Sequence, residues 1–288
     1  MTGIVVMSYP YVERSLYVEQ AVRINRMYDE HAEKLREEKT SLADLRDKME
    51  RYNRKLYEEG QSGLKDAWSY EDSSFELKEW GLQDDMMGYV EIPKLGISVP
   101  LYLGASEANM TRGAVHLSQT SLPIGGENTN SVLAAHRGYY RAEMFQNIDQ
   151  LKPGDEIYVT NLWETLRYRV RETKVIEPNE VDQVLIRKGE DLVTLITCHP
   201  YPYDYQRYAV YCERDGSAGV EEKAEVTKQT EAIAVSHSFM LRVREQVKEY
   251  NGILWIMTAG AATGILFYMI HRRRRKRIRK QWGDIRRM

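Results

Sequence analysis

The stretch DLVTLITCHP, at residues 191–200, decides the fold class. Its apolar run from Leu192 to Thr197 is short and rich in β-branched residues, and a loop with two prolines follows it. This pattern is typical of a buried β-strand that opens into a loop. Six more stretches have similar length and a period near two, at 88–92, 98–103, 131–135, 156–160, 166–171 and 208–212. Many short strands without alternating helices predict an all-β core over residues 87–216, as a barrel or a sandwich.

The region before the strands, residues 11–59, is patterned as helix. Apolar or aromatic residues recur three or four positions apart among charged ones, as at Ile24, Tyr28, His31 and Leu35. The spacing predicts an amphipathic helix or a helical hairpin, with a coiled-coil dimer as the alternative. Residues 60–86 contain GQSG and EDSS and are predicted to be a linker.

Both ends of the chain suggest a membrane. Residues 252–270 form a run of 19 residues without a charge, which as a helix would span roughly 28 Å, close to a bilayer core of about 30 Å. The basic tail at 271–288 follows directly, and such a cluster beside a span indicates a cytoplasmic side. The alternatives are a buried core helix for the apolar run and nucleic-acid binding for the basic tail. Because the run and the tail are directly adjacent in the sequence, a transmembrane helix is favoured.

Several further expectations follow from a C-terminal span. The polar residues 217–251 are predicted to be a helical stalk between barrel and membrane, which places the barrel outside the cell. Gly260 and Gly264 form a GxxxG pattern, which suggests self-association of the span. Residues 1–10 contain GIVVM, which is too short for a signal peptide or a span. We interpret this segment as the remnant of an N-terminal signal or second membrane segment.

Composition narrows the function classes. The tail carries ten Lys/Arg and one Asp of the chain's 41 Lys/Arg and 43 Asp/Glu, so the remainder is acidic, with 31 basic and 42 acidic residues. Cys198 and Cys212 are the two cysteines, which excludes a disulfide scaffold and leaves no zinc motif. No P-loop or GxGxxG is present. The sequence therefore predicts no metal, no cofactor and no nucleic-acid partner.

Three residues carry candidate chemistry. Cys198 ends the buried strand at the mouth of a loop, and Arg207 begins the next strand nine residues later, so a hairpin would place a permanent cation near the thiol. His136 closes another strand, in VLAAHRG. A nucleophile, a proton carrier and a cation that stabilises an oxyanion are what acyl transfer needs. Taken singly, each is more often a packing residue or a solvated charge, and a Cys198–Cys212 disulfide across the hairpin is a further alternative.

The flanking strings resemble those of the sortase family of cysteine transpeptidases. They are GYVEIPKLGISVPLYLGAS, GAVHLSQTSLPIGGENTNSVLAAHRG, FQNIDQLKPGDEIYV and DLVTLITCHPY with YQRYAV, and they cover about residues 88–212. The resemblance implies a closed eight-stranded β-barrel and cleavage of an LPxTG-type sorting signal between Thr and Gly. It implies that Cys198 forms a thioester, that His136 serves as acid and then as base, and that Arg207 orients the carbonyl or stabilises the oxyanion.

Within that family the chain is most similar to class C, the pilin polymerases of Gram-positive bacteria. TSLPIGG, the N-terminal helical region and the C-terminal span carry this likeness. Class C enzymes have a lid with an Asp-Pro-aromatic motif, and Asp66-Ala67-Trp68 stands at the corresponding place. The resemblance implies that Asp66 pairs with Arg207 and that Trp68 covers Cys198. The alternative is an ordinary surface loop.

His199 departs from the family, which more often has a small residue after the cysteine. His199 and Thr197 are candidate residues of the substrate cleft, although His199 could equally point outward. We interpret His116 and Cys212 as structural.

The implied partners are pilin or surface proteins with a C-terminal sorting signal. The acceptor amine would be a pilin lysine or, in a wall-anchoring sortase, a peptidoglycan precursor. A non-catalytic membrane protein with a ligand-binding β-domain is the alternative from another class.

Overall fold

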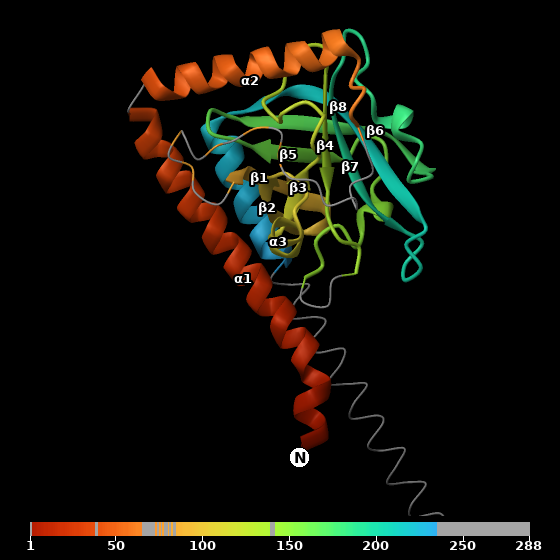
Figure 1. Ribbon diagram of the computed structural model, residues 1–288. Helices are drawn as coiled ribbons and strands as arrows, with labels where there is room; N and C mark the ends of the chain where they lie inside the picture. Colours follow the sequence, from red (N-terminus) through yellow and green to blue (C-terminus); the bar gives the residue numbers. More distant parts are fainter. Residues whose placement is uncertain are drawn as a thin grey trace, which may run out of the picture. The chain divides into compact units, whose positions relative to one another are not determined.

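The computed structural model of the chain describes residues 2–37, 40–64, 85–138 and 142–234, together with residues 73, 75, 77, 80 and 82. Two helices come first, and eight strands with one short helix follow in the described part (Figure 1). Residues 220–234 are also helical. The elements are α1 (Thr2–Glu37), α2 (Thr40–Glu59), β1 (Met86–Ile92), β2 (Ile97–Leu103), α3 (Glu107–Arg112), β3 (Ala114–His116), β4 (Thr129–Ala134), β5 (Glu156–Thr160), β6 (Thr165–Ile176), β7 (Asp191–His199) and β8 (Gln206–Ala218).

The strands close into a barrel in the order β1-β2-β3-β4-β7-β8-β6-β5. The pairs β2–β3 and β4–β7 are parallel and the other pairs are antiparallel. This confirms the expected closed eight-stranded barrel. The residue pattern predicted seven of the strands and missed β3, because three residues are too few to show a period of two.

The barrel interior is a continuous apolar core. Each strand contributes alternate residues to it, and their side chains therefore point inward together. β7 supplies Val193 and Leu195, and β8 supplies Val210 and Cys212, all fully buried. A second apolar cluster covers the outer face of the neighbouring strands β4, β7 and β8, where Ile196 is one of the buried members.

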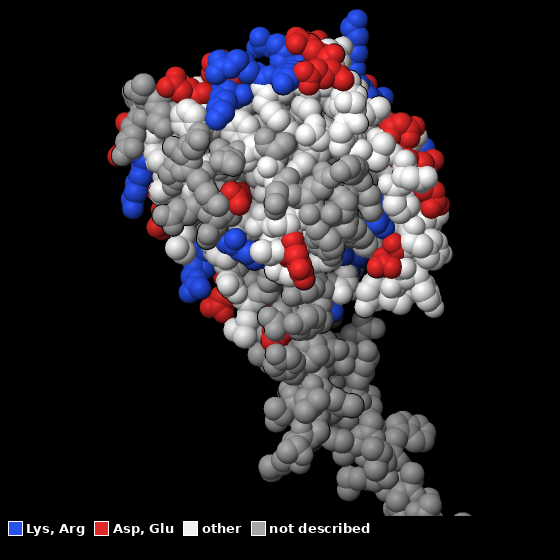
Figure 2. Space-filling view, in the orientation of Figure 1, with Lys and Arg blue, Asp and Glu red and all other residues white. Residues whose placement is uncertain are grey.

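The N-terminal helices pack their apolar faces on the chain's own barrel. Leu45 and Met49 of α2 are fully buried in a cluster that also contains Met87 and Tyr89 of β1. The opposite face of α2 shows interspersed basic and acidic residues (Figure 2), which form ion pairs four residues apart, such as Arg46 with Glu50. The apolar stripe that suggested a coiled-coil dimer is therefore covered within one chain.

The described part of the expected stalk is a helix that packs against the barrel and α1. In residues 220–234, Thr230 is fully buried and Lys223 forms an ion pair with Asp29 of α1 at 2.7 Å. Gly96 has φ +63, and a Cβ there would lie 2.7 Å from the Ile233 side chain and 2.8 Å from the backbone N of Ala234. The described part of this helix is thus packed on the barrel and α1.

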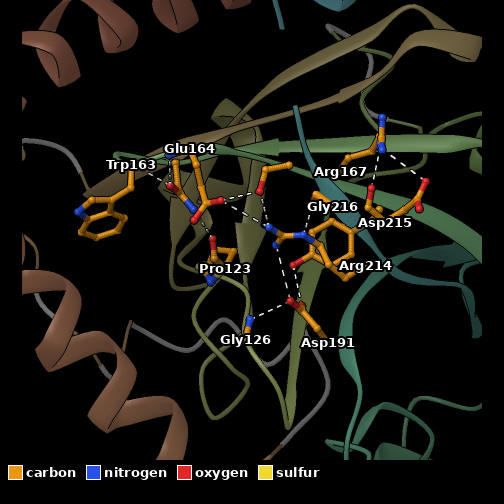
Figure 3. A network of polar contacts seen from close by, with 12 residues as sticks. Pro123, Gly126, Trp163, Glu164, Arg167, Asp191, Arg214, Asp215 and Gly216 are labelled. Carbon is orange, nitrogen blue, oxygen red and sulfur yellow. Dashed lines mark hydrogen bonds and ion pairs between the residues drawn. The ribbon is translucent and has the colours of Figure 1, made fainter. Parts of the chain in front are cut away.

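A polar network fixes the end of β7 opposite to Cys198 (Figure 3). The carboxylate of Asp191 accepts hydrogen bonds from the backbone N–H of Gly126 at 2.8 Å and the hydroxyl of Tyr168 at 2.9 Å. Arg214 pairs with both Asp191, at 3.6 Å, and Glu164, at 3.5 Å. These contacts join β7 to β6, β8 and the loop before β4, and so hold the strand that carries the cysteine.

Several predicted segments lie outside the described residues. They are the span at 252–270 with Gly260 and Gly264, the tail at 271–288, and residues 235–251 of the expected stalk. Among the helices that the structure describes, none has the length and apolar character needed to cross a bilayer. Residues 2–10 form the first turns of α1.

Candidate active site

Three neighbouring strands bring the three candidate residues together. β4 and β7 run parallel with Ala134 opposite Ile196, and the backbone N–H of Ala135 bonds to the carbonyl of Ile196 at 3.2 Å. Continuing this register by two residues places His136 beside Cys198. On the other side of β7, the antiparallel register pairs Cys198 directly with Arg207 of β8. Positions far apart in sequence therefore meet at one edge of the barrel.

Cys198 is a half-buried free thiol, and Cys212 is a fully buried one. The expected alternative of a bridge between them is wrong, because β8 places Cys212 opposite Val193, five residues along β7 from Cys198. Cys212 points into the barrel interior, where burial raises its pKa far above the usual range. Only Cys198 has the partial exposure that a nucleophile needs.

The histidine is held at the start of the loop after β4. His136 is half-buried, and its carbonyl accepts a hydrogen bond from the backbone N–H of Phe145 at 3.1 Å. Burial lowers the pKa of the imidazole, which favours the neutral form at pH 7. A neutral imidazole can accept the proton of a neighbouring thiol.

Arg207 is almost wholly buried, at 5% exposure. Its Nη1 donates hydrogen bonds to the carbonyls of Asp204 at 2.8 Å and Gln206 at 3.0 Å. These contacts hold the guanidinium against the loop between β7 and β8. A buried, fixed cation next to a nucleophile can stabilise negative charge that develops on a substrate oxygen.

The expectation that Thr197 lines the substrate cleft is corrected by its burial. Thr197 is fully buried, and its hydroxyl donates to the carbonyl of Ala135 at 2.8 Å. Side chains alternate between the faces of a strand, so Thr197 shares the inward face of β7 with Leu195, whereas Cys198 shares the outward face with Ile196. Thr197 joins the two strands beneath the site.

His199 lies on the same inward-facing side of β7 as Thr197 and is half-buried. Its Nδ1 lies 2.5 Å from Nη1 of Arg137, and its ring lies 5.7 Å from that of Tyr208. The His199 side chain therefore contacts residues at this end of the barrel and does not share the face of Cys198.

Sequence reasoning missed Arg137, which directly follows His136. Arg137 is 8% exposed and contacts Asp149 as well as His199. A buried arginine is uncommon without partners. The HRG string gave a hint of this role, because it puts an arginine directly after a strand-end histidine, where its side chain needs charged or polar partners. His116, by contrast, is buried as expected, with Nε2 bonded to the carbonyl of Ser121 at 3.0 Å.

The lid residues Asp66 and Trp68 lie outside the described residues, but the segment before them is placed. Gln61, at 5% exposure, donates to the carbonyl of Gln119 at 3.1 Å and accepts from the backbone N–H of Ile186 at 2.7 Å. Leu64 packs into the outer apolar cluster that contains Ile196. The chain thus approaches from α2 over the face of the barrel that carries Cys198.

A closed barrel with a cysteine between a histidine and an arginine on adjacent strands has the features of a cysteine acyl-transfer site. The profile of the sortase domain family matches residues 90–215. Sortase C of Streptococcus pneumoniae superposes with a TM-score of 0.62 at 34% identity, covering 69% of this chain and 100% of that one. Sortase C-1 of Actinomyces oris gives a TM-score of 0.54 at 38% identity, covering 60% and 97%. The chain belongs to the sortase family.

Curated relatives are more distant in sequence. Sortase A of Listeria monocytogenes is 28% identical over 149 residues, which are 52% of this chain and 63% of the relative. Sortase D of Bacillus subtilis is 25% identical over 130 residues, 44% of this chain and 63% of the relative. The matches thus cover somewhat less than two thirds of these relatives. The solved structures similar to this chain are class C, or pilin, sortases.

Proposed function

We propose that the chain is a class C-type sortase, a transpeptidase that cleaves an LPxTG-like sorting signal and passes the product to an amine. The observation that carries the proposal is the strand register, by which His136, just after β4, lies beside Cys198 of β7 and Cys198 lies beside Arg207 of β8. The similar solved structures include a Streptococcus pneumoniae sortase C with pilin substrates, which supports a pilin substrate for this chain.

The residues suit a two-step acyl transfer. The sulfur of Cys198 attacks the carbonyl carbon of the signal's Thr, and His136 takes the thiol proton. Arg207 stabilises the negative charge on the oxygen. The Thr–Gly bond breaks, the proton passes from His136 to the leaving Gly amine, and a thioester remains. An incoming amine then attacks the thioester, and its proton returns through His136 to the departing Cys198 sulfur.

Single substitutions test the chemistry. Cys198→Ala should abolish cleavage of a fluorogenic sorting-signal peptide. His136→Ala should lower kcat by roughly a hundred- to ten-thousandfold, the usual range for a general acid–base. Arg207→Gln should lower it by roughly a hundred- to thousandfold, as for loss of an oxyanion donor. Cleavage by the Cys198→Ala protein would refute the cysteine mechanism, whereas absence of cleavage by the wild-type protein would favour a non-catalytic β-domain.

The acceptor separates pilus polymerisation from wall anchoring. Incubation with a pilin subunit should give an SDS-resistant ladder that is lost when the pilin lysine is replaced. A product formed only with a peptidoglycan-precursor amine would instead identify a wall-anchoring sortase. The proposed setting is the cell membrane, with a span at 252–270, the barrel outside and the basic tail at 271–288 inside. Protease treatment of intact cells should then remove the barrel and spare the tail.

We further propose that Asp66 and Trp68 form a lid over Cys198, with Asp66 paired to Arg207. The support is the placement of Leu64 on the face of the barrel that carries the cysteine. An indole over the thiol would exclude water and reagents. Trp68→Ala should raise the rate of Cys198 alkylation by iodoacetamide, while Trp163→Ala, in the cluster beneath α2, should leave it unchanged. Equal rates for wild-type protein and Trp68→Ala would exclude the lid.

A further inference from the structure

Arg137 occupies an unusual position between the two strands that carry the histidine and the cysteine. It follows His136 directly, yet its guanidinium reaches across to the end of β7. There Nη1 lies 3.4 Å from the carbonyl oxygen of Cys198 and 2.5 Å from Nδ1 of His199. The side chain of Arg137, the residue after His136, thus contacts the backbone of Cys198.

The other half of the guanidinium is held by an acid. Nη2 donates to Oδ2 of Asp149 at 2.5 Å, and Asp149 belongs to the 3-10 turn η5 (Ile148–Gln150). The neighbouring Ile148 is fully buried in the barrel core, so the acid is attached to a fixed element. The Arg137 guanidinium carbon also lies 6.0 Å from the ring centroid of Tyr208 on β8. Arg137 therefore connects β4, β7, β8 and η5.

The contact with His199 fixes the protonation of that imidazole. A guanidinium can only donate, so Nδ1 of His199 must accept and any ring proton resides on Nε2. Burial and then the Arg137 charge lower the pKa of His199, although Asp149 opposes this effect. The lowered pKa favours the neutral form of the histidine that follows Cys198.

The loops that leave the two strands also touch here. A Cβ at Gly138 would lie 2.0 Å from the ring of Tyr201, so the chain after Arg137 and the chain after His199 pack against each other. The HRG string thus has a physical explanation. By register the histidine lies beside Cys198, the arginine bridges to the strand that carries the cysteine, and glycine permits the close approach of the two loops.

We propose that Arg137 is a positioning residue, whose two-pronged bridge from Cys198 and His199 to Asp149 keeps His136 and Cys198 in reacting geometry. The inference rests on the proposed function. Nη1 of the planar guanidinium contacts Cys198 and His199, and Nη2 donates to Asp149. The single ammonium nitrogen of a lysine cannot reproduce this geometry. The bridge contacts the backbone carbonyl of Cys198 and not its outward-facing side chain. It therefore acts on the alignment of the reacting atoms, and its loss should affect kcat more than KM.

The test measures kcat and KM for the sorting-signal peptide in folded variants. Arg137→Gln should lower kcat by roughly ten- to hundredfold, the range expected when reacting groups are misplaced by about 1 Å, with KM nearly unchanged. Arg137→Lys should not restore kcat. Lysine keeps the positive charge but lacks the two separate donor nitrogens of the guanidinium. Arg169→Gln is the matched control, since Arg169 is a more exposed arginine, paired with Glu156 and Asp215 on the far part of β6, and it should behave as wild type.

Asp149→Ala keeps the test decisive if Arg137→Gln fails to fold, because the side chain of Asp149 is 38% exposed and its loss should be tolerated. It should lower kcat in the same direction by a smaller factor. Wild-type kcat in folded Arg137→Gln or in Asp149→Ala, or full rescue by Arg137→Lys, would overturn the positioning role. In each of these cases Cys198→Ala is measured in parallel. Loss of cleavage in that variant leaves the proposed function standing, whereas retained cleavage overturns the proposed function itself.

Discussion

At the scale of single residues, the two cysteines differ by burial alone. Cys198 is half-exposed at a strand end, whereas Cys212 is enclosed in the barrel core. Burial raises the pKa of Cys212, so its reactive thiolate is scarce and inaccessible. Titration of native protein with a thiol reagent should therefore modify one cysteine, and titration after denaturation should modify two. Cys198→Ala should show none in the native state, and a native count of zero in the wild type would indicate that Cys198 is inaccessible.

Residue types and strand ends predicted His136, Cys198 and Arg207 as candidate site residues, because each stands where a strand meets a loop, and the strand register brings the three positions together. The inward placement of Thr197 and His199 could not be predicted, since the strand period gives two faces but does not say which one forms the cleft. Arg137 was missed for a related reason. Its partner Asp149 lies 12 residues away in a turn that has no periodic signal.

At the scale of elements, a buried carboxyl lies where β1 meets the helix at 220–234. Glu91 is fully buried, and its Oε2 accepts a hydrogen bond from Thr227 at 3.2 Å. Lys223 and Glu231 face it from the helix and Asp29 from α1, while Ser98 and Tyr158 are its partners on the neighbouring strands. Burial above all raises the pKa of Glu91 from 4.5 to about 7. The helix therefore docks most firmly when this carboxyl is protonated.

The sign of the pH dependence follows from that shift. The folded state binds the proton more tightly than the unfolded state, so the stabilising contribution is complete below pH 4.5 and is lost as the pH rises to about 7. The loss amounts to about 3 kcal/mol, taking 1.36 kcal/mol per pKa unit. Glu91→Gln cannot ionise, so its unfolding free energy relative to wild type should rise by up to that amount over this interval.

The unfolding free energy of the wild-type protein alone does not isolate Glu91. Burial lowers the pKa of His116 from 6.5 to about 4, so the His116 contribution to stability rises with pH and opposes that of Glu91. A comparison of variants is therefore needed. Denaturant unfolding at pH 4.5, 5.5, 6.5 and 7.5 provides the measurement. Glu156→Gln, at a partly exposed ion-paired glutamate on β5, is the control and should show a nearly constant offset. Parallel curves for Glu91→Gln and wild type would show that Glu91 is already charged when the helix docks.

The sequence predicted a polar helical stalk between the barrel and a membrane. In its described part the polar residues pair with the barrel and α1, as Glu222 does with Arg167 at 2.7 Å and Glu231 with Arg26 at 3.6 Å. Composition reports solvation preferences but cannot identify partners that are distant in sequence. The N-terminal helices were predictable, since their apolar residues recur at the helical period and need a surface to cover.

At the scale of the whole molecule, the end of α2 connects the helical region to the site. The side chain of Gln61 makes two hydrogen bonds, one to Gln119 in the loop before β4 and one to Ile186 in the loop before β7. Leu64 then packs into the outer apolar cluster that contains Ile196 of β7. The chain that leads to Asp66 and Trp68 is thus attached at its start to both loops that border the strands of His136 and Cys198.

Gln61→Ala should loosen this attachment and, if Trp68 covers the thiol, expose Cys198 more often. A lost hydrogen bond with buried partners costs about 1–3 kcal/mol. If about 1.4 kcal/mol of this favours the open lid, alkylation of Cys198 should speed up roughly tenfold. Lys55→Ala, at an exposed position of α2 just before Gln61, should leave the rate unchanged. Combining Gln61→Ala with Trp68→Ala should add little to Trp68→Ala alone, because both changes remove the same cover. Fully additive effects would mean that Gln61 stabilises the barrel loops and has no part in shielding the cysteine.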